Sequence, residues 1–530
     1  MKKWMLVLLL MSAFLPAAAQ TDEVLRAALY LTGAGSPEEL DERFLEELEA
    51  LRNHPLPLNR ASRARLLESG LLTPYQAAAL EEYRSLSGDV LSFAELELVD
   101  GFGQEAVAAL RPFLSLASAR APGEAVRDTI RWQHSALMRA TLKDVGAKYK
   151  LGVGRVEAAG AWKGEGGTFY GLYRLRKGKI LVGDYNIRYG QGLAFWSAFR
   201  LSGLTTLDAF SKRPAGITPS WSFTGSGTFR GLAWDYTGGP WQVALFGALD
   251  GTVGAHAGWL GRYGQIGLTV SRTKVSLDGK YGFRGVDLFG EAAWQGKSPA
   301  GLAGCLFPLG DRWKGALQVR ALPSAYSGKR NSEYGVAAGV AFRTDDRAMN
   351  ASWTVDAALI PIPQQDPKRK QLKSTTLASW KLNETWLLES RLVVRLKSGE
   401  DSHTDLRADL TWNRGVWTVK TRLNGVYDGH IGALGYVEGG WKPPGGFGWV
   451  RFTLFSTPDW QSRIYCYERD APGSFTVPAC YGTGCSVMGY AGWKWRFRRT
   501  AVKLYLRGSY LWKKEKPGQA GLKLQLAVDR

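Results

Sequence analysis

Residues 417–424 read WTVKTRLN, and this stretch decides the fold class. Its odd-numbered positions are mostly apolar, from Trp417 to Leu423, whereas its even-numbered positions include Lys420 and Arg422. Successive side chains of a β-strand point to opposite faces, so the stretch predicts a strand with one apolar and one charged face. An aromatic residue at the end of the apolar face is typical of a strand that crosses a membrane.

The same alternation recurs in segments of about ten residues from residue 127 to the C-terminus, with Gly-, Asn- and Asp-containing turns between them. A soluble β-sandwich rarely repeats this pattern so often with tryptophan near the segment ends. Residues 127–530 are therefore predicted to form a large antiparallel transmembrane β-barrel of roughly 20–26 strands, an even number. Its predicted lumen residues are Lys420, Arg422, Arg391, Arg395, Lys503 and Arg507.

The charge divides the chain into two regions of opposite sign. The whole chain has 68 Lys+Arg and 48 Asp+Glu, a net charge of +20. Residues 20–124 contain 9 basic and 18 acidic residues, or −9, and residues 125–530 contain 57 against 30, or +27. We expect a linker at 121–126 between the two regions. A basic lumen lowers the barrier for anions, so an open barrel is expected to prefer them.

Residues 1–19 read as a secretory signal peptide. Lys2 and Lys3 precede an apolar stretch, and Ala17 to Ala19 form a small-residue cleavage site. The mature chain is therefore predicted to leave the cytoplasm. Beyond this segment no run approaches the ~18–20 apolar residues of a membrane-spanning helix.

Residues 20–120 are predicted to form short helices around glycine turns. Gly101, Phe102 and Gly103 separate two of these helices, whereas the earlier turn at Gly70 lacks a second glycine. A glycine turn followed by a helix N-terminus can bring backbone N–H groups to a phosphate, which is the helix-hairpin-helix signature. The candidate DNA-binding residues are Arg60, Arg63, Arg65, Gly101, Phe102 and Gly103. The acidity of the region favours a protein-docking or structural module instead.

One long interruption divides the strands. About forty residues, 190–228, lie between a strand ending near Tyr189 and the next beginning at Phe229. A barrel this wide conducts unless its lumen is filled, and loops of this length are usually functional. Residues 190–228 are therefore predicted to fold inward as a loop or plug.

Several motifs point to a known family. Residues 58–77 and 83–113 resemble the paired hairpins of competence-type DNA-binding proteins. Residues 183–185, 189–193 and 229–231 resemble Gram-negative outer-membrane proteins that join an N-terminal helix-hairpin-helix domain to a large barrel. The resemblance implies an outer-membrane barrel with the helical domain in the periplasm.

The residues that could support chemistry are few and scattered. Cys480 and Cys485 are close enough in sequence to form a disulfide, Cys466 could compete for either, and free thiols fit equally well. Ser402, His403 and Asp405 are neighbours on one turn, where triad geometry is out of reach. We therefore expect no enzyme activity, no metal site and no cofactor.

The sequence thus predicts a non-enzymatic outer-membrane β-barrel with a periplasmic helix-hairpin-helix domain, and non-sequence-specific DNA binding or uptake as its specific role. The alternative is an assembly, scaffold or transport component whose acidic domain docks a periplasmic protein. The expected partners are outer-membrane lipid, DNA and that periplasmic protein.

Overall fold

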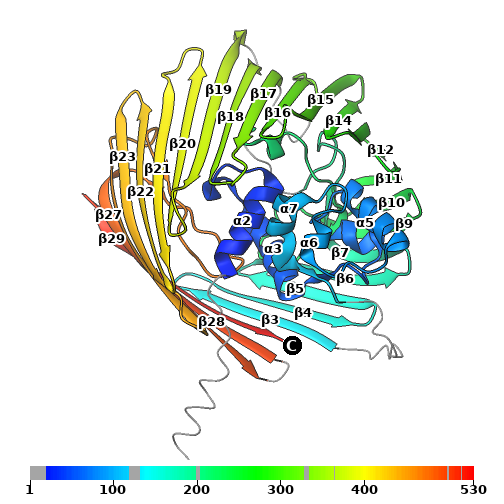
Figure 1. The fold of residues 1–530 in the computed structure, drawn as a ribbon, viewed down its shortest axis with the longest axis horizontal. Helices are drawn as coiled ribbons and strands as arrows, with labels where there is room; N and C mark the ends of the chain where they lie inside the picture. The colour runs from blue at the N-terminus through cyan, green and yellow to red at the C-terminus, as the bar shows by residue number, and fades with distance from the viewer. Residues whose placement is uncertain are drawn as a thin grey trace, which may run out of the picture.

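The computed structural model describes residues 20–117, 132–197, 203–326, 333–362, 365–497, 500–514 and 516–530. The predicted signal peptide (1–19) and linker (121–126) lie outside the described residues. In the described part, 24 antiparallel strands close a barrel, with the last strand paired to the first (Figure 1). The prediction of a large antiparallel barrel with roughly 20–26 strands is confirmed.

The barrel follows the chain around its circumference, each strand pairing with the next. The first half comprises β3 (Trp132–Thr141), β4 (Val145–Val153), β5 (Val156–Lys163), β6 (Gly166–Leu175), β7 (Gly178–Arg188), β9 (Phe229–Gly238), β10 (Trp241–Ala248), β11 (Val253–Leu260), β12 (Gly264–Ser271), β13 (Val275–Phe283), β14 (Val286–Gln295) and β15 (Ser298–Pro308). The second half comprises β16 (Trp313–Leu322), β17 (Glu333–Arg343), β18 (Met349–Ile362), β19 (Gln365–Lys381), β20 (Trp386–Lys397), β21 (His403–Arg414), β22 (Trp417–Asp428), β23 (Ile431–Trp441), β24 (Gly446–Thr457), β27 (Gly482–Phe497), β28 (Thr500–Lys513) and β29 (Lys516–Asp529).

The two faces of the wall differ as the alternation predicts. On β22, Trp417 and Leu423 are 55% and 67% exposed, whereas Arg422 is 3% exposed. Large apolar side chains cover the exterior of nearly every strand in the same way. Such an apolar exterior on a closed barrel belongs in a membrane, and barrels of this kind are outer-membrane structures. No helix among the described residues has the length and apolar character to cross a bilayer.

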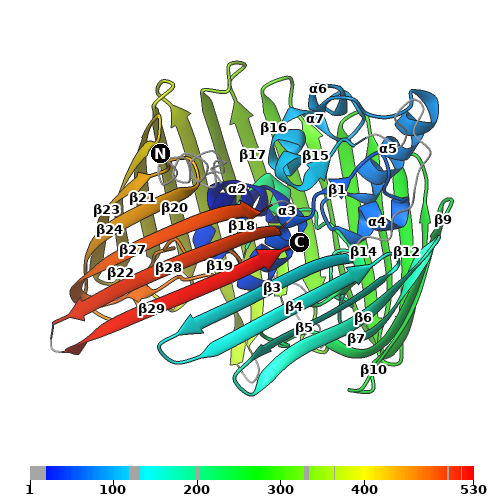
Figure 2. The ribbon, with the colours of Figure 1, turned by 90° about the horizontal axis from the view of Figure 1, so that it is seen from below.

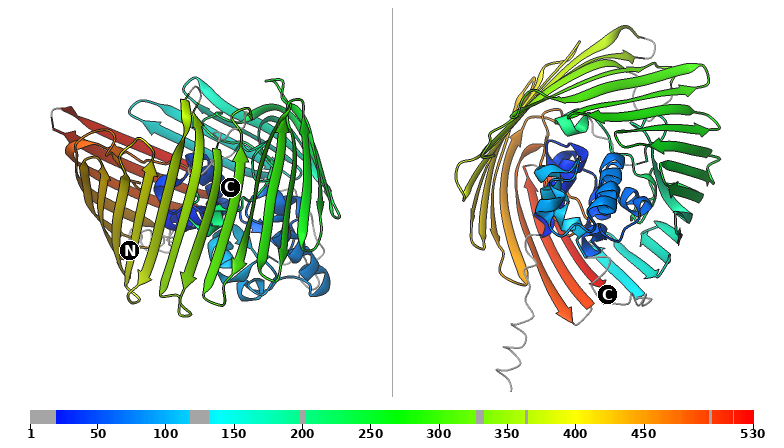
Figure 3. Two further views of the ribbon diagram at one scale, coloured as in Figure 1. Left: turned by 90° about the horizontal axis from the view of Figure 1, so that it is seen from above. Right: turned by 45° about the vertical axis from the view of Figure 1, so that its right-hand side comes forward.

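The N-terminal helices lie inside this barrel (Figures 1 and 3). We call residues 20–117 the helical plug. It comprises α2 (Gln20–Thr32), η1 (Pro37–Glu39), α3 (Glu42–Asn53), α4 (Arg63–Glu68), α5 (Pro74–Leu86), α6 (Phe93–Leu96), α7 (Gly103–Leu110) and η2 (Arg111–Phe113). The short strands β1 (Leu56–Pro57) and β2 (Leu114–Ser115) pair in parallel. Capping boxes begin α5 at Thr73 and α6 at Ser92.

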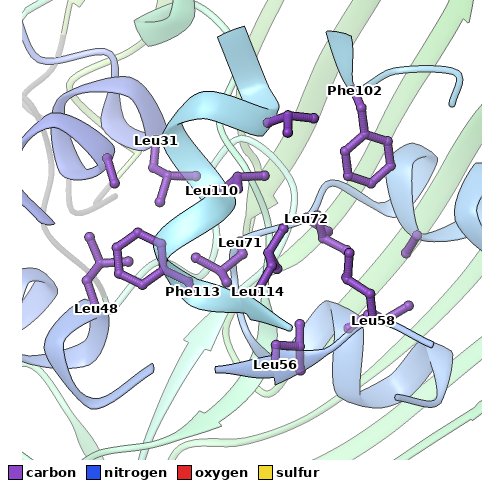
Figure 4. Close-up of a cluster of buried hydrophobic side chains, with 14 of the residues drawn as sticks. Leu31, Leu48, Leu56, Leu58, Leu71, Leu72, Phe102, Leu110, Phe113 and Leu114 are labelled. Carbon is purple, nitrogen blue, oxygen red and sulfur yellow. The ribbon is translucent and has the colours of Figure 1, made fainter. Parts of the chain in front are cut away.

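The plug has an apolar core of its own. Leu31, Leu48, Leu58, Leu110 and Phe113 belong to one buried cluster (Figure 4), and all are 8% exposed or less. Almost all members of this buried cluster belong to the plug itself. The helices therefore form one packed body whose contacts with the barrel wall are of another kind, described below.

Two connections between strands also fold inward. The first inserted loop (189–228) contains η3 (Leu207–Ala209) and β8 (Gly216–Pro219), which pairs with β7 beside β9. The second inserted loop (458–481) contains the short strands β25 (Ile464–Tyr465) and β26 (Ala479–Cys480). All four cysteines are free thiols, so the considered Cys480–Cys485 disulfide is not formed.

The placement of the helices corrects one expectation. A periplasmic domain was predicted for residues 20–120, whereas α2 and α3 lie within the lumen and α5 and α6 lie at one mouth of the barrel (Figure 2). The physical reason is charge: an acidic domain lowers the electrostatic energy of a strongly basic barrel when it enters the lumen. The alternation pattern of single strands carries no information about this docking.

Candidate functional site

The plug meets the wall through a row of carboxylates on residues 38–47. Pro37 begins η1, and the Asp41 side chain caps α3 by accepting a hydrogen bond from the Arg43 N–H. These two short elements present five acids toward six different strands. Within the described residues the nearest N···O distances are Glu38–Arg422 2.6 Å, Glu38–Arg407 3.0 Å, Glu39–Arg391 3.1 Å, Glu42–Arg139 3.0 Å, Glu46–Lys148 2.7 Å and Glu47–Arg188 2.7 Å.

Glu38 occupies the centre of a buried charge cluster. Besides Arg422 and Arg407, its carboxylate accepts a hydrogen bond from the Tyr467 N–H at 3.0 Å. Asp409 on β21 accepts from Arg422 Nε at 2.6 Å and from Arg407 Nη2 at 2.7 Å. Burial would raise the pKa of Glu38, but Arg422, Arg407 and the Tyr467 N–H hold it well below its usual range. Glu38 is therefore held as a carboxylate that joins the plug, the wall and the second inserted loop.

Glu68 at the end of α4 forms a second cluster. Its carboxylate lies 2.6 Å from Arg174 Nη1, 3.3 Å from Arg65 Nη1 and 3.9 Å from Lys179 Nζ. Burial would raise the pKa of Glu68, yet Lys179, Arg174 and Arg65 hold it far below its usual value. This cluster fixes the far side of the plug to β6 and β7.

Acid is expected to loosen the plug. The lowered pKa values of Glu38 and Glu68 mean that their stabilisation is complete above the ordinary glutamate pKa near 4.5 and is lost progressively as the pH falls below it. Burial raises the pKa of Glu42, so this carboxyl takes up its proton earlier. Hydrogen exchange of the α3 amides at pH 7 and pH 3, corrected for intrinsic rates, should show faster exchange at pH 3. Equal protection at both values would contradict this.

One wall carboxylate accepts several hydrogen bonds from the start of the first inserted loop. Glu291 on β14 accepts three backbone hydrogen bonds, from the N–H groups of Gln191 at 2.6 Å, Leu193 at 3.0 Å and Ala194 at 3.1 Å. Gly190, with φ of +57°, makes the turn that brings these groups together. A side chain at Gly190 would lie 2.7 Å from the Glu291 carboxylate, so glycine is required there.

The second inserted loop is held by cations of the last strands. Arg451 Nη1 donates to the Tyr467 carbonyl at 2.6 Å, and Lys523 Nζ lies 2.5 Å from Asp470. Arg507 pairs with Glu468. The sequence pattern did not predict this loop as a lumen element. The unusual length of residues 458–481 between two strands was the feature that could have predicted an inserted loop.

The predicted lumen residues occupy the inner side of the wall. Arg391 and Arg422 pair with plug carboxylates as described, and Arg507 pairs with the second loop. Lys503 Nζ lies 2.6 Å from Asn53 Oδ1 of α3, and Lys420 Nζ lies 3.4 Å from Glu389. Arg395 has no carboxylate partner among the described residues. Most of these cations therefore contact the plug, a loop or a neighbouring strand.

The candidate DNA-binding arginines have other partners. Arg63 Nη1 donates to the Gly239 carbonyl at 2.9 Å and lies 3.4 Å from Glu81. Arg65 lies 3.3 Å from Glu68, within the cluster described above. Arg60 is exposed. Two of the three guanidinium groups are thus already engaged by carboxylates.

In the turn at Gly101, Phe102 and Gly103, only Gly103 has free space around its Cα. Phe102 is 6% exposed and packs in the core of the plug. A side chain at Gly101 would lie 2.7 Å from the Tyr75 ring, whereas one at Gly103 would meet nothing within 4 Å. Gly101 is therefore needed for packing, and Gly103 for its φ of +65°. Among the described residues no group of three or more His, Cys, Asp or Glu is placed to hold a metal ion.

The chain was compared with protein families, curated proteins and solved structures. No protein-family model and no curated protein match the chain. Solved structures that it resembles include Pseudomonas aeruginosa OccK5 (OpdH), with 9% identity, TM-score 0.32 and coverage of 75% of this chain and 96% of that one. The outer-membrane protein OpdK of the same organism has 9% identity and a TM-score of 0.32, with coverage of 76% of this chain and 98% of that one. The P pilus usher (PapC) translocation pore has 8% identity and a TM-score of 0.29, with coverage of 75% of this chain and 98% of that one.

Proposed function

We propose that this chain is an outer-membrane transport barrel closed by its own N-terminal domain, and that the helical plug must shift before an anionic solute passes. The observation that carries the proposal is the ionic character of the contact between plug and wall. Residues 38–47 and Glu68 meet wall cations, whereas the apolar core of the plug is internal.

An interface of this kind suits a movable plug. A buried ion pair adds little net stability over apolar packing, but breaking one partner is costly, so the pairs specify position more than they add stability. Charges on both sides can also exchange partners for mobile ions when the plug moves, which apolar surfaces cannot do. Because the leucine core lies within the plug, the domain can shift as one body without unfolding.

Further cations on the inner side of the wall support anion preference. Four basic side chains of β13, β16, β19 and β20 lie on the lumen side of their strands by the alternation of the two faces: Lys280, Lys314, Lys373 and Arg395. None of the four has a carboxylate partner within ion-pair distance among the described residues. Unpaired cations of this kind lower the barrier for anions.

The orientation of the barrel supports a periplasmic entrance for the plug. Arg63 contacts the turn between β9 and β10, and Glu82 lies 3.5 Å from Arg262 in the turn between β11 and β12. These turns lie at the barrel end where β3 begins and β29 ends, and both inserted loops leave from the opposite end. Outer-membrane barrels have short periplasmic turns and longer extracellular loops, so the plug end is the periplasmic end.

Planar-bilayer recordings of the full chain test the proposal. We expect a low resting conductance because the plug and both inserted loops occupy the lumen. Residual or voltage-induced openings should show reversal potentials of an anion-preferring pore in a salt gradient. A wild-type channel that is wide open at rest and selects cations would contradict both the plug and the basic pathway.

A second role is favoured by the exposed corner between α5 and α6. Leu86, Leu91 and Leu98 are 79%, 77% and 85% exposed there, at one mouth of the barrel (Figure 2). Exposed apolar side chains on an otherwise acidic domain suit a periplasmic protein partner that displaces the plug. A photo-cross-linker at Leu98 in intact cells should give a protein adduct, and one at Leu249, 83% exposed at the other end, should not. No adduct at Leu98 would contradict docking.

DNA binding has weaker support than plugging. The domain carries net negative charge, and Arg63 and Arg65 are paired with Glu81 and Glu68. In a gel-shift titration at moderate salt, we expect the purified full chain to show no saturable binding of duplex DNA. A shift that Arg63→Glu removes would instead restore the nucleic-acid role.

A further inference from the structure

A small cavity lies where the helical plug, the first inserted loop and the barrel wall meet. Its volume is about 140 Å³. Leu31 and Gly70 line it from the plug, Ser211 and Arg213 from the loop, and Arg188 and Gln318 from the wall. Three parts of the molecule that are distant in sequence thus share one enclosed space.

The lining contains an unusual set of buried polar atoms. Arg188 Nε, Ser211 Oγ, Arg213 Nη1 and Gln318 Oε1 are all buried, and none has a hydrogen-bond partner among the described residues. Leaving a buried polar group unpaired costs about 1–3 kcal/mol, so proteins rarely collect four at one place. Such a collection indicates that a bound species completes the hydrogen bonding.

The charge around the cavity indicates an anion. Arg188, Lys212 and Arg213 line the cavity with three positive charges. Asp208 lines it with one negative charge and Glu47 pairs with Arg188 at 2.7 Å, which leaves one positive charge in excess. Neighbouring rings hold two of these cations in place: Arg213 lies 4.9 Å from the centre of the Tyr30 ring, and Lys212 lies 4.8 Å from that of Trp196. The side chains are therefore preorganised around the space rather than free to turn away.

The unpaired atoms also define the chemistry of the ligand. The Nε–H of Arg188, the hydroxyl of Ser211 and an Nη1–H of Arg213 are donors, which suit the oxygens of an oxyanion. The Oε1 atom of Gln318 is an acceptor, because its Nε2 donates to the Phe210 carbonyl at 2.9 Å. An acceptor beside three donors suits an oxyanion that itself carries a hydroxyl group.

We propose that this cavity binds a small hydroxyl-bearing oxyanion, such as monohydrogen phosphate or a short hydroxy acid. At ~30 Å³ per water molecule the space holds only a few waters, or one ion of this size. An ion bound there links plug, loop and wall, and so stabilises the closed arrangement. The site goes beyond the proposed transport role, because binding in the closed protein requires no conduction.

Calorimetric titration of the detergent-purified full chain with inorganic phosphate tests the site, in a chloride buffer of constant ionic strength. We expect saturable binding with one ion per chain, and weaker binding of sulfate, which carries no hydroxyl group at neutral pH. Arg213→Gln should weaken phosphate binding about tenfold or more, because a charge-assisted hydrogen bond is lost. Ser211→Ala is a milder change that preserves charge and should weaken binding several-fold.

Arg272→Gln is the matched control, since it removes an exposed arginine from the turn after β12 and should leave binding unchanged. Absence of saturable phosphate binding in the wild-type protein would overturn the proposal, and the cavity would then hold water alone. Equal affinity in wild type and Ser211→Ala, with Arg213→Gln also unchanged, would overturn it as well. Neither result would affect the bilayer test of the transport role.

Discussion

Replacing Glu38 with lysine is expected to open the barrel. The new ammonium group would lie against Arg422 and Arg407, whose nitrogens now approach the Glu38 carboxylate to 2.6 and 3.0 Å. Removing one partner of a buried pair costs about 3–5 kcal/mol, and reversing its charge adds repulsion. The Asp409 carboxylate would then be the acidic partner shared by the new lysine, Arg422 and Arg407. The plug segment should leave the wall, and the resting conductance in planar bilayers should rise several-fold.

Asp100→Lys provides the matched control for this change. It makes the same charge reversal in the plug at an exposed position, and no hydrogen bond or ion pair of Asp100 occurs among the described residues. Its conductance should remain at the wild-type level. Equal conductance in Glu38→Lys and wild type, with the variant protein correctly folded, would contradict the plug as the closing element.

Replacing Glu291 with alanine is expected to release the first inserted loop. Three backbone N–H groups, of Gln191, Leu193 and Ala194, would lose their common acceptor while remaining buried. A hydrogen bond to a charged group contributes about 1.5–3 kcal/mol, so the combined loss is large even when part of it is regained from water. Amide exchange at Gln191 should accelerate about a hundredfold or more.

The neighbouring acid allows a strict comparison. Asp278 lies directly opposite Glu291 in the register of β13 and β14, and it makes no hydrogen bond with the inserted loop among the described residues. Asp278→Asn should therefore leave exchange at Gln191 close to the wild-type rate. If both variants changed amide exchange at Gln191 equally, the loop would depend on the total negative charge of this part of the wall and not on the hydrogen bonds of the Glu291 carboxylate.

Local patterns accounted for the wall of the barrel. The alternation around Trp417 and Arg422 assigned each side chain to a face, because the period of a strand is two wherever the strand lies. The boundaries of the first inserted loop were also close, since β7 ends at Arg188 and β9 begins at Phe229. These features depend on neighbouring residues and need no knowledge of distant contacts.

Distant contacts explain what was missed. The acids of residues 38–47 read as the surface of a separate domain, yet they pair with strands from β3 to β22. The second inserted loop reads as an ordinary surface connection, yet its Tyr467 N–H reaches Glu38 across 429 positions of the chain. No spacing within either segment identifies a partner so far away.

The sequence by itself determined a basic antiparallel barrel with an apolar exterior, an acidic helical N-terminal region and one inserted loop. Only the tertiary structure decided that the helices occupy the lumen. It also decided that Glu38 and Glu68 bind the helical plug to the wall and that Glu291 binds the first inserted loop. The physical reason is range. Strand periodicity and helix capping act over a few residues. Long-range charge complementarity attracts an acidic segment to a basic wall but does not select which cation each carboxylate pairs with. That pairing is fixed only when the closed wall places particular arginines beside particular carboxylates.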